Sequence, residues 1–400
     1  MIQRDVYLKK IRPFIDTPVV KVLTGMRRCG KTVLLELIKI DLRSRGVDPS
    51  RLLSINFESS LEPYSRNREA CHAHIRESAG RAGGRLYLFL DEVQELEGWE
   101  KLVNSCLVDF DIDIFLTGSN ARMLSGELAT YLGGRYVEIK VYPFSFREAY
   151  ESQRGGQVSL SKGDAFLRYL VLGGMPFLYG HSIDDASARQ YLGDIFDSTI
   201  LKDIAQRNRV RDIDQLRRLI LFLIANAGNT FSSASVIRYL KGEGRSLSTE
   251  TLYNYLRYCI DSCLLHLVPR EDLLGKRLLG FQEKIYLTDH GIRQAIYGNN
   301  LRDIGQTLEN IVYMELVRRG YDVKVGRVGT LEVDFSALRG GEKLYVQVAY
   351  LLADDTTMER EFASLESIPD NYPKLVLSMD EIDRSRNGII HKNIRDFLLE

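Results

Sequence analysis

A run of eight residues near the start of the chain has the composition and spacing of a phosphate-binding loop. It matches G-x4-G-K-[ST] in full and lies between an apolar run and a helical run that begins at Val33. The glycines allow backbone N–H groups to turn inward around the phosphates of ATP, and the next helix adds its positive N-terminal end. The nucleotide-binding residues predicted from this pattern are Gly25, Met26, Arg27, Arg28, Cys29, Gly30, Lys31, Thr32 and Val33.

Two residues of this loop carry assigned chemistry. We expect Lys31 to pair with oxygens of the β- and γ-phosphates and to act in catalysis, and we expect Thr32 to hold Mg2+ through its hydroxyl. Cys29, inside the loop, is interpreted as a small filler residue, because backbone atoms do the binding there.

Adjacent carboxylates end a second apolar run. Asp91 and Glu92 follow Leu86–Leu90, which places them at the carboxyl edge of a sheet, where α/β proteins bind ligands. We predict Asp91 as a magnesium ligand and Glu92 as the base or water-positioning group. The alternative is a solvated acidic loop.

Further polar residues follow the next apolar run. Asn120 is the first choice for a sensor of the γ-phosphate and Ser119 the second, although Gly-Ser-Asn is also ordinary turn chemistry. Arg122 and Arg135 are candidates for stabilising transition-state charge, with Arg135 preferred. A surface arginine explains each of them about as well.

Short β-rich runs alternate with amphipathic stretches up to Val141, which predicts a parallel sheet covered by helices. The expected strands are Val19–Thr24, Leu52–Phe57, Leu86–Leu90, Ile112–Thr117 and Tyr136–Val141. We expect Leu52–Phe57 to separate the loop strand from the acidic strand, as in ATPases with a catalytic glutamate. That arrangement disfavours a GTPase.

The rest of the chain predicts three further parts. After a P-loop core at 1–145, helical periodicity predicts a lid or linker at 146–210, broken by a turn at Gly173–Pro176. Three helical segments and two short strands predict a winged helix-turn-helix at 211–298, and a helix with four strands predicts a separate α/β domain at 299–400. The expected fold class is therefore α/β: a P-loop parallel sheet followed by a helical lid, a winged helix-turn-helix and a terminal α/β domain.

The last helix of the predicted winged helix has two faces. Leu252, Tyr255, Leu256, Cys259, Ile260 and Cys263 recur at spacings of three and four, which predicts a buried face. The opposite face could contact DNA through Thr249, Tyr253, Asn254 and Arg257. Five arginines could attract DNA locally, sense the nucleotide, or pair with acids across a domain boundary: Arg207, Arg209, Arg211, Arg217 and Arg218. A purely structural solvated face would look similar.

The overall composition sets limits on function. Lys plus Arg and Asp plus Glu number 54 each, so bulk electrostatic binding of nucleic acid is not expected. The charged N-terminal segment does not resemble a secretory signal, and no window resembles a membrane span. The five scattered cysteines do not form a disulfide or zinc pattern. These features predict a cytoplasmic protein without a membrane partner.

The chain resembles a prokaryotic family over nearly its full length. GMRRCGKT, FLDEVQ, FLTGSN, ELATYLGGRY and VYPFSFREAY occur in the order typical of AAA+ ATPases, and GGMP, LENIVYMELVRRGYDV and LEVDF extend the match. Together they resemble proteins that pair an AAA domain with the domain of unknown function DUF4143. The resemblance implies ATP binding, a DNA-binding winged helix, and a terminal domain similar to PD-(D/E)xK nucleases, a restriction-endonuclease-like fold.

The nuclease-like pattern falls on three residues of the terminal domain. By the resemblance these are Glu309 in the helix, Asp334 on the second strand and Gln347 on the third. Ala349 stands where such nucleases carry lysine, so the usual ammonium for activating water is missing at that position. We therefore expect the domain to be inactive as a nuclease.

Three function classes follow from these features. The first is a Mg2+-dependent ATPase whose nucleotide state controls a winged helix that binds duplex DNA. The second is a slow or non-catalytic regulator that uses ATP as a structural ligand and binds DNA or protein, and the third is a metal-dependent nuclease. Self-association is left open, and with it whether Arg135 acts in its own subunit or on a neighbour's nucleotide.

Overall fold

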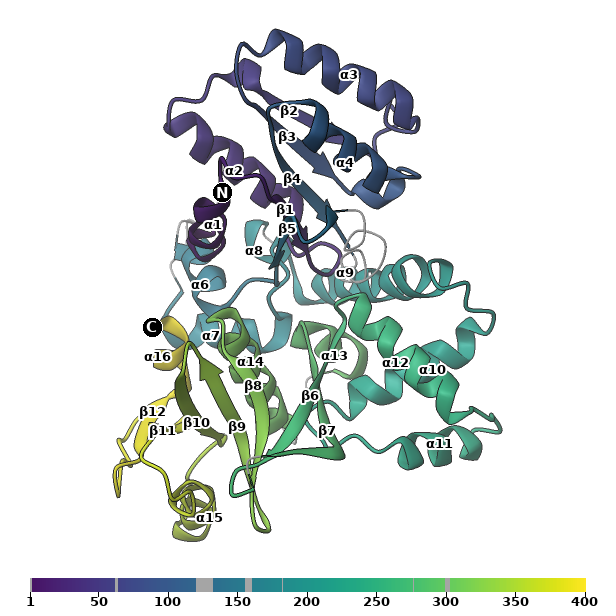
Figure 1. Cartoon of the computed structure of the whole chain (residues 1–400). Helices are drawn as coiled ribbons and strands as arrows, with labels where there is room; N and C mark the ends of the chain where they lie inside the picture. The colour runs from purple at the N-terminus through teal and green to yellow at the C-terminus, as the bar shows by residue number, and fades with distance from the viewer. Residues whose placement is uncertain are drawn as a thin grey trace. The chain divides into compact units, whose positions relative to one another are not determined.

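The computed structural model describes seven stretches of the chain, residues 2–61, 64–119, 132–154, 160–181, 183–275, 277–298 and 303–400, with the backbone alone at 277–282. It divides into two compact units (Figure 1). The first extends to Tyr142 and includes Asp261–Cys263, and the second comprises Pro143–Ile260 and Leu264–Glu400.

The first unit contains a five-stranded sheet in the order β2-β3-β4-β1-β5 (Figure 1). All neighbouring strands are parallel, which confirms the predicted parallel sheet. The strands are β1 Val20–Thr24, β2 Leu52–Asn56, β3 Leu86–Asp91, β4 Ile112–Gly118 and β5 Tyr136–Lys140.

The strand between the loop strand and the acidic strand is β4, and the expectation that Leu52–Phe57 takes this place is wrong. β4 pairs with β1 on one side and with β3 on the other, whereas β2 pairs with β3 at the sheet edge. Chain order does not reveal this arrangement, because a crossover connection can place a later strand between two earlier ones. One strand does lie between the loop strand β1 and the acidic strand β3, but this strand is β4 and not β2.

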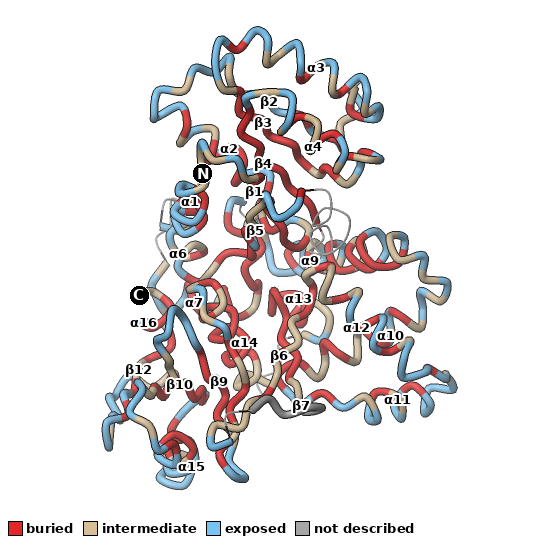
Figure 2. The backbone as a smooth tube through the Cα atoms, in the orientation of Figure 1, coloured by how far each residue is buried: buried red, intermediate tan, exposed pale blue. Residues whose placement is uncertain are grey.

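Helices surround this sheet. They are α1 Asp5–Ile11, α2 Lys31–Ser44, α3 Arg68–Arg81 and α4 Trp99–Asp109, with short 3₁₀ helices at Arg12–Phe14, Pro49–Arg51 and Val93–Glu95. β1, β3 and β4 are buried along their whole length (Figure 2). This burial explains why they appear in the sequence as largely apolar runs, since both faces of a parallel sheet are covered. Two charged exceptions, Lys21 of β1 and Asp113 of β4, are buried and pair with each other.

The second unit begins with the expected helical region. Its helices are α6 Phe146–Arg154, α7 Lys162–Leu172, α8 Phe177–Gly180, α9 Asp185–Ser198, the π-helical segment Thr199–Gln206, α10 Ile213–Ala225, α11 Ser233–Gly242, α12 Thr249–Asp261, α13 His290–Tyr297, α14 Ile304–Arg318, α15 Asp355–Glu366 and α16 Ile394–Leu399. Among the helices that the structure describes, none is long and apolar enough to cross a membrane.

A seven-stranded mixed sheet completes this unit, in the order β12-β11-β10-β9-β8-β6-β7. Its strands are β6 Leu265–Asp272, β7 Arg277–Leu287, β8 Asp322–Val328, β9 Leu331–Arg339, β10 Glu342–Val348, β11 Lys374–Ser378 and β12 Ile390–Asn393. The hairpin β6–β7 joins the others through parallel pairing of β6 with β8. The expected segments 211–298 and 299–400 therefore share one sheet.

The turn at Gly173–Gly174 is fastened to Asp289, just before α13. A Cβ on Gly173 would lie 1.9 Å from Asp289 Oδ1, and the backbone there has φ 70°, so only glycine fits. The N–H groups of Gly174 and Gly291 donate to the Asp289 carboxylate at 2.9 and 2.7 Å. Burial raises the pKa of Asp289 to about 6, against the effect of these two amides.

Candidate active site

The phosphate loop requires its first glycine for a close approach. Gly25 follows β1 with φ 154°, and a Cβ there would lie 2.1 Å from the carbonyl oxygen of Val141. Gly30, at the other end of the loop, has φ 100° and immediately precedes α2. A side chain at Gly25 would move the loop away from its neighbour, so the bend depends on glycine there. The residues present fit a phosphate cradle.

The side chain of Lys31 folds back against the backbone of the loop, and the residue is 4% exposed. Its Nζ donates to the carbonyl oxygens of Gly25 at 3.1 Å and Met26 at 3.2 Å. It also lies 3.5 Å from Glu92 Oε1. The ammonium group therefore points toward the acidic end of β3, and it lies closer to these two neutral oxygens than to Glu92.

Asp91 ends β3 and is held by two hydroxyls. Thr32 Oγ1 donates to Asp91 Oδ2 at 2.9 Å, and Thr117 Oγ1 donates to Asp91 Oδ1 at 2.6 Å. Burial raises the pKa of Asp91, while these hydrogen bonds oppose the rise. The two residues predicted to hold Mg2+ thus lie in direct contact. Oxygen ligands of this kind suit the ion.

Glu92 has an uncommon backbone conformation for a non-glycine residue, with φ 51°. Its N–H donates to Thr117 Oγ1 at 2.8 Å, and Gln94 Nε2 donates to its Oε2 at 2.5 Å. One threonine hydroxyl therefore accepts from Glu92 and donates to Asp91. Sequence reasoning missed Thr117, although it ends the predicted strand Ile112–Thr117 and precedes the candidate sensors.

A second missed residue is Arg4, which is 2% exposed. It donates through Nη1 to the carbonyl oxygen of Cys29 at 3.0 Å and through Nη2 to that of Tyr142 at 2.7 Å. Its guanidinium lies over the ring of Tyr7, 4.4 Å from the centroid. Arg4 therefore ties the segment before α1 to the phosphate loop. No motif marks it, because it belongs to the charged start of the chain.

The remaining catalytic candidates have different outcomes. Asn120 and Arg122 lie outside the described residues, and Ser119 is buried just after β4. Arg135 is exposed and donates to Asn104 Oδ1 of α4 at 2.9 Å. Its carbonyl accepts from the N–H of Val20, at the start of β1. Since the loop follows the other end of this strand, about 16 Å of strand separates the two, and Arg135 is not brought to the phosphate loop of its own chain.

The division of α12 into core and surface follows the expectation at most positions. Leu252, Tyr255, Leu256 and Cys259 are buried, and Ile260 and Cys263 are only partly buried. The predicted DNA-contacting residues Thr249, Tyr253, Asn254 and Arg257 are exposed. Three of the five nearby arginines form ion pairs within the second unit: Arg207 with Asp203, Arg217 with Asp197, and Arg218 with both Asp214 and Glu243. Pairing with acids thus takes up much of the local positive charge.

The three nuclease-like residues lie close together beside a lysine that sequence reasoning missed. Lys284 of β7 lies 2.8 Å from Glu309 Oε1 and 3.9 Å from Asp334 Oδ1. Gln347 Oε1 accepts from the N–H of Asp334 at 3.2 Å, and its amide donates to Glu361. Ala349 indeed supplies no charge, but an ammonium group reaches the cluster from another strand.

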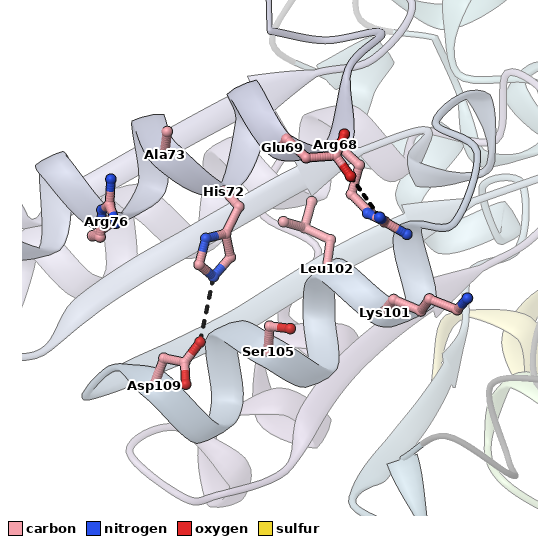
Figure 3. Close-up of a pocket in the computed structure, with 9 residues that line it drawn as sticks. All are labelled: Arg68, Glu69, His72, Ala73, Arg76, Lys101, Leu102, Ser105 and Asp109. Carbon is pink, nitrogen blue, oxygen red and sulfur yellow. Dashed lines mark hydrogen bonds and ion pairs between the residues drawn. The ribbon is translucent and has the colours of Figure 1, made fainter.

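A surface groove of about 530 Å³ lies between α3 and α4 (Figure 3). It is lined by Arg68, Glu69, His72, Ala73, Arg76, Lys101, Leu102, Ser105 and Asp109. Figure 3 shows His72 turned toward Asp109, and Nε2 and Oδ2 are 3.4 Å apart. None of the predicted site residues lines this groove, so it is separate from the nucleotide chemistry.

Comparisons with known proteins place the chain in a family. Residues 17–150 match the AAA domain model AAA_14, and residues 163–303 match a domain of unknown function, DUF8612. The expected DUF4143 and nuclease-like assignments are not confirmed by these matches. An uncharacterized protein of Haemophilus influenzae is 36% identical over 100% of this chain and 99% of its own length. The uncharacterized protein MJ1544 of Methanocaldococcus jannaschii is 29% identical, over 92% of this chain and 81% of the relative.

A solved structure has a similar fold over part of the chain. The Walker-type ATPase PABY2304 of Pyrococcus abyssi is similar with a TM-score of 0.51 and 16% identity, over 74% of this chain and 95% of the other. At this identity the likeness concerns the fold alone. On the AAA-domain match and the full-length identity, this chain is an AAA-type P-loop protein and belongs to the same family as the Haemophilus influenzae protein.

Proposed function

We propose that this protein binds Mg2+-ATP at the loop Gly25–Thr32 and hydrolyses it. The observation that carries the proposal is the meeting of Lys31, Asp91 and Glu92 at one end of the sheet, with the Lys31 Nζ 3.5 Å from Glu92. In this proposal Lys31 exchanges its bonds to neutral carbonyl oxygens for bonds to phosphate oxygens. The exchange is favourable because attraction between the ammonium group and anionic phosphate oxygens adds to the hydrogen bonds.

Thr32 and the two acidic residues then have different roles in the reaction. Thr32 and Asp91 hold the metal, and Glu92 orients the attacking water and takes its proton. Mg2+, when bound, neutralises charge on the phosphate oxygens. Thr117 fixes both acids because its single hydroxyl contacts the Asp91 carboxylate and the Glu92 N–H.

We extend the proposal to Arg135 as a residue that acts on the nucleotide of a neighbouring subunit. Its place beside the start of β1, at the far end from Gly25, argues against action within its own chain. An arginine supplied from another subunit can stabilise transition-state charge. Equimolar mixtures of Lys31→Ala and Arg135→Ala proteins should then regain part of the activity that each lacks alone. A mixture with no more activity than the two separate proteins would exclude this role.

The DNA-binding part of the proposal rests on element order in the second unit. After α10, Thr230 forms an isolated antiparallel bridge with Lys284, and α11, α12 and the hairpin β6–β7 follow. This order is the one expected of a winged helix, in which the last helix presents its exposed face to the major groove. We propose that the nucleotide state controls access to α12.

A slower regulatory ATP-binding function is the second candidate, and one observation favours it. Glu92 accepts a hydrogen bond from Gln94 at 2.5 Å and lies near the Lys31 ammonium. Both contacts engage the carboxylate oxygens, so Glu92 must exchange partners before it can accept a proton from water. A protein arranged in this way would hold ATP longer than it turns it over.

Phosphate release at steady state tests these functions. It should be measured with and without duplex DNA, alongside the oligomeric mass. Turnover that depends on Mg2+ and Glu92, and that changes with duplex DNA, is expected. Tight Mg2+-ATP binding without turnover under any of these conditions would support the regulator, whereas absence of ATP binding would refute both.

A further inference from the structure

The terminal sheet contains a buried ammonium group surrounded by carboxylates. Lys284 is 4% exposed, and its Nζ lies 2.6 Å from Glu332 Oε1, 2.8 Å from Glu309 Oε1 and 3.9 Å from Asp334 Oδ1. The three acids come from α14 and β9, whereas the lysine comes from β7. Residues distant in sequence therefore meet around one ammonium group.

Protein donors satisfy the oxygens around this charge. The Tyr286 hydroxyl donates to Glu309 Oε1 at 2.5 Å, and Arg270 Nη2 donates to Glu332 Oε2 at 2.6 Å. The N–H of Val348 donates to Asp334 Oδ2 at 2.9 Å. Each carboxylate thus already has a donor besides Lys284, which is the arrangement that makes a buried ion cluster stable.

A nuclease-like fold implies a divalent metal at these residues, and the residues present do not fit one. The Lys284 Nζ lies among the three carboxylates, where a metal would need their oxygens. The Gln347 side chain is occupied by the Asp334 N–H and by Glu361. Within the described parts of the chain, no group of three or more His, Cys, Asp or Glu side chains could hold a metal ion.

We propose that Lys284 is a built-in cation that closes this carboxylate cluster to divalent metals and locks the hairpin β6–β7 to α14 and β9. The ammonium group supplies positive charge where a metal would otherwise supply it. The cluster therefore serves to hold the hairpin that follows α12 in a fixed position on the terminal sheet. It does not activate water for cleavage of nucleic acid.

Lys284→Met in the full-length chain tests this directly, since methionine keeps much of the volume and removes the charge. We expect a lower unfolding temperature, because the buried carboxylates of Glu309 and Asp334 lose their counter-charge, while the partly exposed Glu332 keeps Arg270. Adding Mn2+ should restore part of the loss in this variant and should have no comparable effect on the wild type. Lys324→Met is the matched control: this lysine of β8 contacts Glu271 outside the cluster, and its variant should not respond differently from wild type.

A second variant keeps the proposal testable if the Lys284→Met protein does not fold. Lys284→Met combined with Glu309→Gln and Glu332→Gln removes two of the three negative charges, so folding should return and no response to Mn2+ should remain. Two results would overturn the proposal. One is Mn2+ binding by the wild type that Glu309→Gln abolishes, and the other is a Lys284→Met protein as stable as wild type and insensitive to Mn2+.

Discussion

The two units each place a lysine beside acidic residues, and the two arrangements differ in what satisfies the lysine. Lys31 donates to two neutral carbonyl oxygens at 3.1 and 3.2 Å and lies 3.5 Å from one carboxylate. Lys284 lies 2.6 and 2.8 Å from two carboxylates, with a third at 3.9 Å. At the first site the lysine can exchange carbonyl oxygens for the oxygens of a ligand. At the second site the lysine is bound by carboxylates of the protein itself.

The electrostatics of the second site agree with this difference. Burial alone would lower the pKa of Lys284, but the charges of Glu309, Asp334 and Glu332 outweigh it, and the net pKa lies above the ordinary value. Burial and the Glu309 charge raise the pKa of Asp334. Removing the ammonium group from this cluster, or moving it to another partner, would lower the free energy of unfolding by a large amount. A lysine held by loop carbonyls exchanges partners more easily.

Substitution of Glu92 should have the largest effect on the first site. Glu92→Gln removes the proposed base but keeps a similar shape, so kcat for ATP hydrolysis should fall by about 10²- to 10⁴-fold while ATP still binds. Phosphate release and equilibrium nucleotide binding measure the two quantities. Glu95→Gln, at an exposed position three residues later, is the control and should keep normal turnover. Equal turnover in both variants would remove Glu92 from the mechanism.

A third site sharpens the comparison, because its buried carboxylate, Asp289, accepts from two backbone amides and not from a lysine. The pKa of Asp289 is raised by burial to about 6, so its contribution to folding stability falls as pH rises from about 4 to 6. Burial lowers the pKa of its neighbour His290 to about 4. The contribution of His290 to folding stability is therefore lost as pH falls from 6.5 to 4. The two trends oppose each other.

His290→Gln should separate these trends. Relative to wild type, the variant should gain unfolding free energy as pH falls from 6.5 to 4, by up to about 3 kcal/mol for a pKa change of this size. Urea unfolding across this range measures the difference, with exposed His181→Gln as the control. A difference from wild type that stays constant with pH would contradict the assignment.

Loss of the Thr117 hydroxyl should have a smaller effect than loss of Glu92. Thr117→Val keeps the shape but leaves Asp91 Oδ1 and the Glu92 N–H without their shared partner, which should cost about 1–2 kcal/mol in kcat/KM, roughly 5- to 30-fold. Thr24→Val is the control, since its hydroxyl donates to Glu138 instead. If both variants lose the same activity, the bridging role of Thr117 is wrong.

The smallest expected effect concerns the exposed face of α12. Arg257→Ala should weaken duplex binding several-fold and reduce the slope of log affinity against log salt concentration by about 1, as expected for one lost phosphate contact. Fluorescence anisotropy at several salt concentrations measures this. Arg238→Ala on α11 tests whether the effect is specific to α12. Affinity of the wild type that does not vary with salt would refute the electrostatic account.

The sequence predicted local structure well where one segment carries the whole signal. The five strands of the first sheet, the loop Gly25–Thr32 and the acidic end of β3 all follow from continuous runs of residues. The identity of the middle strand did not follow, because crossover connections separate neighbours in the sheet from neighbours in the chain. Arg4 and Thr117 were missed for the same reason, since each acts on a segment distant in sequence.

The terminal cluster shows this limit most clearly. Ala349 has no charge at the position where the resemblance implies lysine, and the ammonium group is supplied by Lys284, on a strand that the sequence assigns to a different part of the chain. A motif describes residues along one segment. A charge that arrives from a neighbouring strand becomes visible only when the sheet order is known.

Equilibrium titration of the full-length protein with Mg2+-ATP tests the central claim most directly. We predict saturable binding by the wild type, and a loss of about 100-fold or more in affinity for Lys31→Ala, since one charge-assisted contact to phosphate is removed. Lys39→Ala on the same helix should bind as wild type does, because that lysine pairs with Glu36. A wild-type protein without measurable affinity, or a Lys31→Ala protein that binds equally well, would contradict the account.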